Sequence, residues 1–187
     1  MELVFVRHGE GEHTAKPDGL HTLHPVLTTR GERQVIKLQE TWSLSSEDLL
    51  IVSPTVRTLQ TAERWTEDIS CRRVVSPAVG PRMFPQKKEW KTLPCDRTLG
   101  KDRVSAEFPD FHLIGERWVE GINDIPEKEF VDVASELIHW CKQQGKDRVF
   151  VVTHDGTMTA YRQWIEGRPL TREDFPKETD WVRVKVE

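Results

Sequence analysis

The sequence predicts an α/β fold in which a mostly parallel sheet carries helices on both faces. Three short apolar runs, at residues 3–6, 49–52 and 149–152, lead to this prediction. Each run is rich in β-branched residues and precedes a stretch with helical spacing, as buried parallel strands do. All three runs end in polar residues. We therefore expect the chemistry of the protein at the carboxyl edge of the sheet, where ligands of α/β proteins usually bind.

The composition is that of one globular domain over residues 1–187. Lys and Arg total 27 against 31 Asp and Glu, so no basic excess indicates a nucleic-acid partner. The three scattered cysteines form no CxxC pair, which favours reduced thiols and a cytoplasmic location. The chain shows no leader-like segment and no apolar run near the ~20 residues that span a bilayer, so we expect no membrane partner. Composition sets no oligomeric state.

The first predicted strand ends in Arg7-His8-Gly9-Glu10. Arg7 and His8 would then lie at the carboxyl edge of the sheet, and Gly9 would let the backbone turn sharply beside a ligand. A polar loop follows at residues 11–25 and holds three more histidines, His13, His21 and His24. Their spacing matches no standard zinc-ligand set, so we predict no metal site and either solvated side chains or a substrate contact from His13 or His21.

The next predicted elements are a helix, a strand and a second helix. Thr28 is expected to cap a helix that runs to about Trp42. After the strand at residues 49–52, Ser53 is a good N-cap and Pro54 a favoured first helical residue. This arrangement places Arg57 in the first turn, near free N–H groups and the positive end of the helix dipole, which attract anions.

A third strand is predicted at residues 72–76, after which prolines break the pattern from 77 to 126. We interpret 77–126 as a loop-rich insertion over the carboxyl edge, with one helix near 99–108. Several basic residues lie within it, namely Arg82, Lys87, Lys88, Lys91 and Arg97. The segment is either a solvated loop or a lid whose cations, Arg82 among them, contact an anionic substrate. Trp90 is the tryptophan most expected to line a substrate pocket.

The last third of the chain gives the clearest periodicity. Apolar residues at helical spacing predict a helix at 127–144, which Gly145 ends. The third apolar strand follows and ends in Thr153-His154-Asp155-Gly156, before a helix to about residue 165. Residues 181–186 alternate as an edge strand does.

Two arginines and two histidines should therefore converge at one sheet edge. Arg7 and Arg57 offer planar, permanently charged forks that match phosphate oxygens. An imidazole such as that of His8 can attack phosphorus and form a covalent phosphoenzyme, while His154 stabilises the equatorial oxygens. Phosphoryl transfer mainly needs positioning and charge neutralisation, and these side chains supply both without a metal.

The sequence resembles the histidine phosphatase superfamily, the phosphoglycerate-mutase-like proteins. Arg7-His8-Gly9-Glu10 matches the N-terminal signature of that family, and the stretch from Ser53-Pro54 through Arg57 to residue 62 matches its arginine block. The blocks Leu27-Thr28-Thr29-Arg30-Gly31 and Val152-Thr153-His154 match as well. The resemblance implies the phosphoglycerate-mutase-like fold, a phosphorylated His8, and a phosphate pocket made by Arg7, Arg57 and His154.

The chain departs from the family pattern at two places. Thr14 stands where the family usually has asparagine, so a weaker substrate contact is expected there. The family's usual proton-donating glutamate falls by position on Pro81-Arg82, which carries no carboxyl group. Three carboxyl groups remain as candidates, Asp155, Glu89 and Asp96. We favour Asp155, which resembles the His-Asp pair of the phytase-like branch, and place Glu89 second; a helix N-cap is the alternative role for Asp155.

The sequence thus predicts a phosphomonoesterase without metal or cofactor, acting through phospho-His8 on a small phosphorylated substrate. A sugar phosphate, a carboxylated phosphate and a phosphoprotein all fit this prediction. Two alternatives stay open. One is a catalytically impaired phospho-ligand-binding protein of the same fold, and the other is a phosphoglycerate-type mutase.

Overall fold

The computed structural model describes all residues from 1 to 187 and contains one six-stranded sheet of order β4-β3-β2-β5-β1-β6. The strands are β1 (Glu2–Arg7), β2 (Leu49–Val52), β3 (Arg72–Val75), β4 (His112–Leu113), β5 (Arg148–Thr153) and β6 (Trp181–Lys185). Every neighbouring pair is parallel except β1 and β6, which pair antiparallel at the edge. The predicted mostly parallel sheet with a final edge strand is confirmed.

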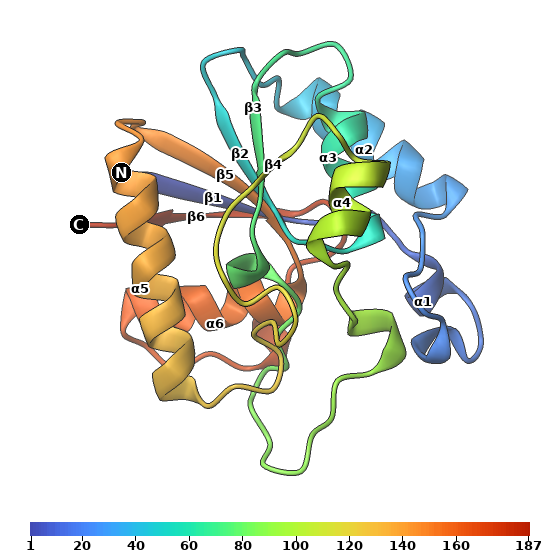
Figure 1. Ribbon diagram of the computed structural model, residues 1–187, viewed down its shortest axis with the longest axis vertical. Coiled ribbons are helices and arrows are strands. Elements are labelled where there is room, and N and C mark those ends of the chain that lie inside the picture. The colour runs from blue at the N-terminus through green and yellow to red at the C-terminus, as the bar shows by residue number, and fades with distance from the viewer.

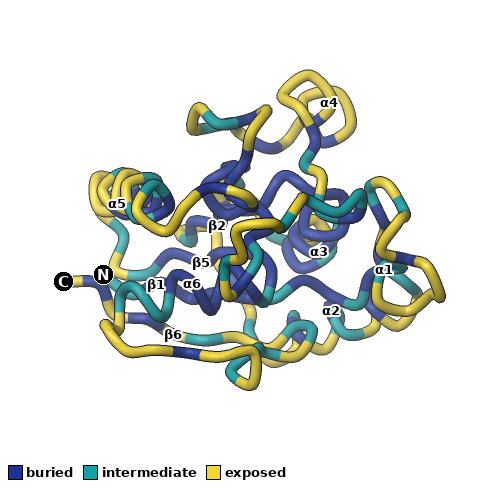
Figure 2. The backbone as a smooth tube through the Cα atoms, turned by 90° about the horizontal axis from the view of Figure 1, so that it is seen from below, coloured by how far each residue is buried: buried dark blue, intermediate teal, exposed yellow.

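Helices cover both faces of this sheet (Figure 1). They are α1 (Glu12–Ala15), α2 (Thr29–Thr41), α3 (Val56–Trp65), α4 (Lys101–Glu107), α5 (Glu127–Gln143) and α6 (Asp155–Glu166). Because side chains alternate along a strand, Phe5 and Val151 pack toward α5 and α6, whereas Val4 and Val52 pack toward α2 and α3. Figure 2 shows the result, with buried strands between helices whose outer faces are exposed. The two buried clusters fix the strand ends that carry the site.

The start of α3 differs from the prediction. Thr55, not Ser53, is the N-cap, and its backbone N–H donates to the Thr58 hydroxyl at 3.3 Å. The Ser53 hydroxyl instead contacts Nε2 of His154 at 2.8 Å, so it is not available to cap the helix. The expected position of Arg57 in the first turn is nevertheless confirmed.

Two glycines allow α2 to approach the end of β1 closely. A Cβ added at Gly31 would lie 2.2 Å from the Glu10 carbonyl oxygen, and one at Gly9 would lie 2.7 Å from the Gly31 carbonyl oxygen. Thr28 caps α2 as predicted, accepting from the Gly31 N–H at 3.0 Å. The backbone that follows His8 is therefore held against α2 by contacts that leave no room for a side chain.

The 77–126 segment is more integrated with the sheet than a loop-rich insertion. Its first turn, η2 (Pro77–Val79), accepts hydrogen bonds from Thr153 and Tyr161 through the Val79 and Ala78 carbonyls, at 2.6 and 2.9 Å. Further on it supplies the edge strand β4 and the helix α4. The sequence did not predict β4, because two residues are too few to show a period. None of the helices is long and apolar enough to cross a membrane.

Candidate active site

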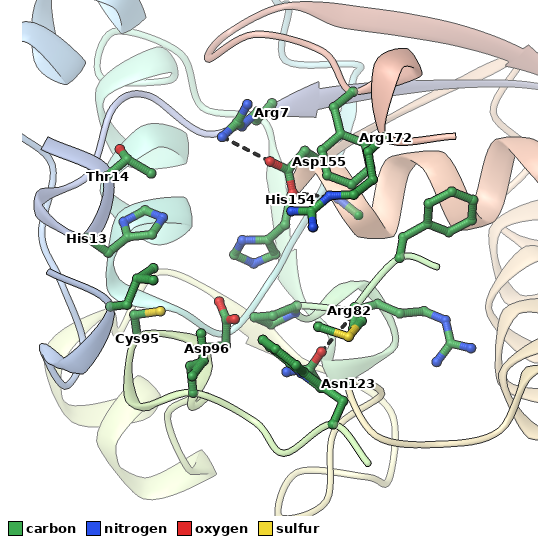
Figure 3. A pocket seen from close by; sticks show the side chains of 18 of the residues that line it. Arg7, His13, Thr14, Arg82, Cys95, Asp96, Asn123, His154, Asp155 and Arg172 are labelled. Atoms are coloured by element: carbon green, nitrogen blue, oxygen red, sulfur yellow. Dashed lines mark hydrogen bonds and ion pairs between the residues drawn. The ribbon is translucent and has the colours of Figure 1, made fainter. Parts of the chain in front are cut away.

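A cavity of about 690 Å³ opens at the carboxyl edge of the sheet (Figure 3). Its floor is formed by His8 after β1, Arg57 in the first turn of α3, and His154 at the N-cap of α6. All three side chains are buried. The prediction that these strand ends converge is confirmed, because parallel strands place their carboxyl ends on one edge.

His8 is held as a neutral imidazole whose Nε2 carries a lone pair and no hydrogen. Nδ1 lies 2.7 Å from the Gly9 carbonyl oxygen, which only accepts, so Nδ1 carries the hydrogen. Nε2 then accepts from Nε of Arg57 at 3.2 Å. Burial, followed by the positive charge of Arg57, holds the pKa of His8 well below its ordinary value of 6.5. Nε2 is therefore unprotonated at neutral pH and can act as a nucleophile.

Arg57 joins three parts of the chain at the floor of the cavity. Besides His8, its guanidinium donates to the Cys95 carbonyl at 2.7 Å, to Oδ1 of Asp96 at 3.1 Å and to Nδ1 of His154 at 3.2 Å. Burial lowers its pKa and the Asp96 carboxylate opposes that shift, but a guanidinium stays charged in either case. The turn η3 (Pro94–Asp96) of the 77–126 segment is thereby fixed beside both histidines.

His154 faces His8 across the floor, with 5.1 Å between the ring centroids. Because Arg57 can only donate, Nδ1 of His154 accepts and Nε2–H donates to the Ser53 hydroxyl. Burial, and then Arg57, keep the pKa of His154 well below 6.5. The floor thus holds two neutral imidazoles around one buried cation, a set that attracts an anion.

Arg7 forms the side of the cavity and is fixed by its neighbours. Its guanidinium donates to the Pro176 carbonyl at 2.7 Å and pairs with Oδ2 of Asp155 at 3.0 Å. Its Nε is buried and has no hydrogen-bond partner within the protein. Asp155 also accepts from the Gly156 N–H at 2.6 Å. The carboxylate of Asp155 is therefore already committed to holding Arg7 and the start of α6.

Thr14 and His13 line the cavity next to His8. The Thr14 hydroxyl donates to the Gly11 carbonyl at 3.1 Å, so it stabilises the short helix α1. The His13 ring lies 5.5 Å from the His8 ring, its Nδ1 is buried without a partner, and burial lowers its pKa to about 3. A Cβ at Gly11 would lie 2.7 Å from that Nδ1, so the glycine makes room for the imidazole.

Arg82 and Glu89 do not occupy the positions expected of them. The backbone of Arg82 borders the cavity, but its buried guanidinium donates to the Ile122 and Ile125 carbonyls at 2.8 and 3.0 Å and pairs with Glu127 at 2.9 Å. With these partners Arg82 braces the wall, which corrects the predicted substrate contact. Glu89 is exposed and does not line the cavity.

Asp96, the third carboxyl candidate of the sequence, lies at the floor of the cavity. It lines the cavity beside Arg57, and its side chain keeps 25% of its surface exposed. Burial raises its pKa above the ordinary 3.8, although Arg57 acts against that shift. The sequence offered Asp96 only as one of three carboxyl candidates, because no local pattern links it to Arg57, which lies 39 residues earlier.

The fold and this cavity are typical of a phosphoryl-transfer enzyme, because two imidazoles and two arginines lie together at one sheet edge. The sequence supports this class directly, since the model of the histidine phosphatase superfamily (branch 1) matches residues 3–180. The chain therefore belongs to the histidine phosphatase superfamily. The predicted class, a phosphatase, is confirmed at this level.

Solved structures show the same fold. The alpha-ribazole phosphatase from Shigella flexneri superposes with a TM-score of 0.65 at 21% identity, over 100% of this chain and 91% of the other. A mycobacterial glucosyl-3-phosphoglycerate phosphatase gives 0.64 at 15% identity, over 98% and 92%. A phosphoserine phosphatase from Entamoeba histolytica gives 0.62 at 18% identity, over 97% and 89%. Among curated proteins, no sequence matches this chain.

Proposed function

We propose that the protein is a phosphomonoesterase that works through a phosphohistidine on His8 and needs no metal or cofactor. The observation that carries the proposal is the unprotonated Nε2 of His8, which is buried at the floor of the cavity beside a guanidinium. The substrate is a small phosphorylated molecule, since a cavity of about 690 Å³ suits a metabolite-sized ligand. The three structural relatives act, by name, on different phosphate esters, so they do not select one.

The proposed reaction has two displacements at phosphorus. Nε2 of His8 attacks the phosphoryl group, a P–N bond forms and the P–O bond to the leaving group breaks. An acid protonates the leaving oxygen and becomes a carboxylate. That carboxylate then takes a proton from water as the water oxygen attacks phosphorus, and the P–N bond breaks to give inorganic phosphate and neutral His8.

Arg7, Arg57 and His154 would hold the phosphoryl oxygens during both steps. The unpaired Nε of Arg7 and the buried guanidinium of Arg57 provide fixed positive charge where negative charge develops. A bound phosphate dianion would also favour protonation of His154 at Nδ1, which would then give up its contact with Arg57 and donate to an equatorial oxygen. The Arg57 hydrogen bond to Nε2 of His8 has to open when the phosphoryl group binds, because the single lone pair of Nε2 then attacks phosphorus.

The proposed acid is Asp96 in place of Asp155, which the sequence favoured. A leaving-group acid must carry a proton near working pH, and burial shifts the pKa of Asp96 in that direction. Each carboxylate is paired with an arginine, Asp155 with Arg7 and Asp96 with Arg57, so the choice of Asp96 rests on its place beside both histidines and on the effect of its burial. We infer that Asp155 positions Arg7. In this proposal the 77–126 segment is part of the single domain and contributes Asp96 to the site.

A leaving-group comparison tests this assignment. Asp96→Asn should slow hydrolysis of an alkyl phosphate by about 100-fold or more and largely spare p-nitrophenyl phosphate, whose leaving group needs little protonation. Asp155→Asn should slow both substrates equally, because it disturbs phosphate binding by Arg7. Equal losses on both substrates in Asp96→Asn would reject Asp96 as the acid. No turnover of p-nitrophenyl phosphate by the unaltered protein would instead support a phospho-ligand-binding protein.

A further inference from the structure

The outer part of the cavity carries positive charge that the floor does not use. Two carboxylates line the cavity, Asp96 and Asp155, and they are paired with Arg57 and Arg7 respectively. Lys87 and Arg172 also line the cavity, and neither makes a salt bridge or a side-chain hydrogen bond within the protein. They come from distant parts of the chain, the 77–126 segment and the turn η4 (Arg172–Asp174) after α6. We call these two residues the rim cations.

Apolar side chains line the cavity together with the rim cations. Met83, Phe84 and Phe175 line the cavity, and the two phenylalanine rings lie 6.3 Å apart between centroids. The guanidinium of Arg172 lies 5.5 Å from the centre of the Phe175 ring, so the arginine extends across an aromatic face. Figure 3 shows Arg172 on the same side of the cavity as Asp155 and His154.

Trp90 carries a polar group without an acceptor in this outer region. Its indole N–H is buried and has no hydrogen-bond partner within the protein, although Trp90 lines the cavity. A buried indole N–H normally finds an acceptor. An acceptor on a bound molecule would satisfy it, whereas an apolar ligand alone would not.

We propose that the outer cavity is a second anion subsite, and that the substrate is a phosphate monoester whose leaving group carries a second anionic group beyond an apolar body. The inference rests on the proposed function, because it places the transferred phosphate at His8. The leaving group then lies against the apolar side chains of the cavity and presents a carboxylate or a second phosphate to the rim cations. Arginine and lysine both recognise these groups, with arginine the more selective partner through its planar fork.

A set of aryl phosphates with similar leaving groups tests the proposal. 4-(Carboxymethyl)phenyl phosphate carries the second anion, its carbamoylmethyl analogue has the same size without charge, and 4-(phosphonomethyl)phenyl phosphate replaces carboxylate by phosphonate. We expect kcat/KM for the carboxylate to exceed that for the neutral amide by about five- to tenfold, mainly through KM, which two partly exposed charge pairs can supply together. The phosphonate arm shows which anion the subsite prefers.

Variants at the rim identify the residues responsible. Arg172→Gln and Lys87→Gln should each reduce the carboxylate-to-amide ratio toward one, while turnover of the amide stays within about twofold. Arg168→Gln and Lys88→Gln are matched controls, because both residues are exposed nearby and neither lines the cavity, and they should leave the ratio unchanged. Trp90→Phe keeps a ring but removes the N–H, and should weaken both charged substrates.

Two results would overturn the subsite. One is a ratio near one in the unaltered protein, and the other is a ratio that neither rim variant changes. Failure of the proposed function looks different, since no substrate would then be hydrolysed. In that case the dissociation constants of the same three compounds, measured by calorimetry, test the subsite. The carboxylate and the phosphonate should bind at least about fivefold more tightly than the amide.

Discussion

The floor and the rim of the cavity are built in opposite ways. The floor residues His8, Arg57 and His154 are buried, belong to the ends of regular elements and make hydrogen bonds with one another. The rim cations Lys87 and Arg172 are exposed, belong to irregular segments and contact no carboxylate. Preorganised charge is what phosphoryl transfer needs, whereas substrate selection can be left to adaptable loops. The difference suggests that the floor fixes the reaction and the rim fixes the substrate.

Apart from removal of His8 or of the proposed acid, the largest effect is expected from a change of the central cation of the floor. Arg57→Lys keeps the charge but loses the planar fork that reaches both histidines, Cys95 and Asp96. Each lost charge-assisted hydrogen bond is worth about 1.5–3 kcal/mol, so kcat/KM should fall by roughly 10- to 100-fold for every phosphate ester. Arg64→Lys is the matched control, since Arg64 is an exposed residue of the same helix. A mutant within about twofold of the unaltered protein would place Arg57 outside the mechanism.

A steric change tests how rigidly the floor is held. In Gly31→Ala the new methyl group would lie 2.2 Å from the backbone carbonyl of Glu10, which cannot move aside without displacing the segment after His8. Overpacking of this kind costs about 1–3 kcal/mol, so the free energy of unfolding in urea should fall by that amount and activity should fall with it. Gly100→Ala is the control, because nothing lies within 4 Å of its added Cβ. Equal stability of the two variants would mean that the floor tolerates movement.

The neutral histidines of the floor region predict acid sensitivity. His13 has a pKa of about 3 in the folded protein against 6.5 ordinarily, so the unfolded chain binds its proton first as the pH falls. The neutral His13 contributes fully to stability above about pH 6.5, and this contribution is lost as the pH falls toward the pKa of the folded state. At about pH 5 the loss in the free energy of unfolding amounts to about 2 kcal/mol. In His13→Gln the difference in unfolding free energy between neutral pH and that acidic pH should shrink by the same amount. An unchanged difference would show that His13 is not buried as a neutral group.

The smallest expected effect is that of chelation. Arg7 and Arg57 supply the positive charge that a metal ion would otherwise provide, so EDTA should leave turnover of p-nitrophenyl phosphate unchanged within error. Activity lost on chelation and restored by one divalent ion would contradict the proposed role of the floor.

The same division explains what the sequence could predict. Strands β1, β2 and β5 are apolar runs followed by polar residues, so the order of residue types along the chain was enough to place His8, Arg57 and His154 at one edge. Thr55 displaced Ser53 as the N-cap because the Ser53 hydroxyl contacts His154, a contact between residues 101 apart that no local pattern reveals. N-cap propensity depends on residues that are close along the chain, so it cannot predict a contact with a residue that is distant in sequence.

The carboxyl groups and the basic segment depended even more on long-range contacts. Asp155 was favoured because it follows His154 directly, yet the fold pairs it with Arg7. Asp96 lies in the site because Arg57 donates hydrogen bonds to the turn that carries it. The guanidinium of Arg82 is buried because it pairs with Glu127 and donates to two backbone carbonyls. Of the tryptophans, Trp90 does line the cavity as the sequence suggested. In an irregular segment, a group of basic residues predicts that the segment binds an anion. It does not predict which of those residues contacts the anion.

The most direct test of the account is to trap the phosphoenzyme. After brief mixing with a labelled substrate and quenching in base, the label should be covalently bound, stable in base and lost in acid, as a phosphoramidate is. Peptide mapping should place it on His8, and His8→Ala should show neither label nor turnover. Label found on a serine or an aspartate, or full activity in His8→Ala, would contradict the claim that the floor of this cavity transfers phosphate through His8.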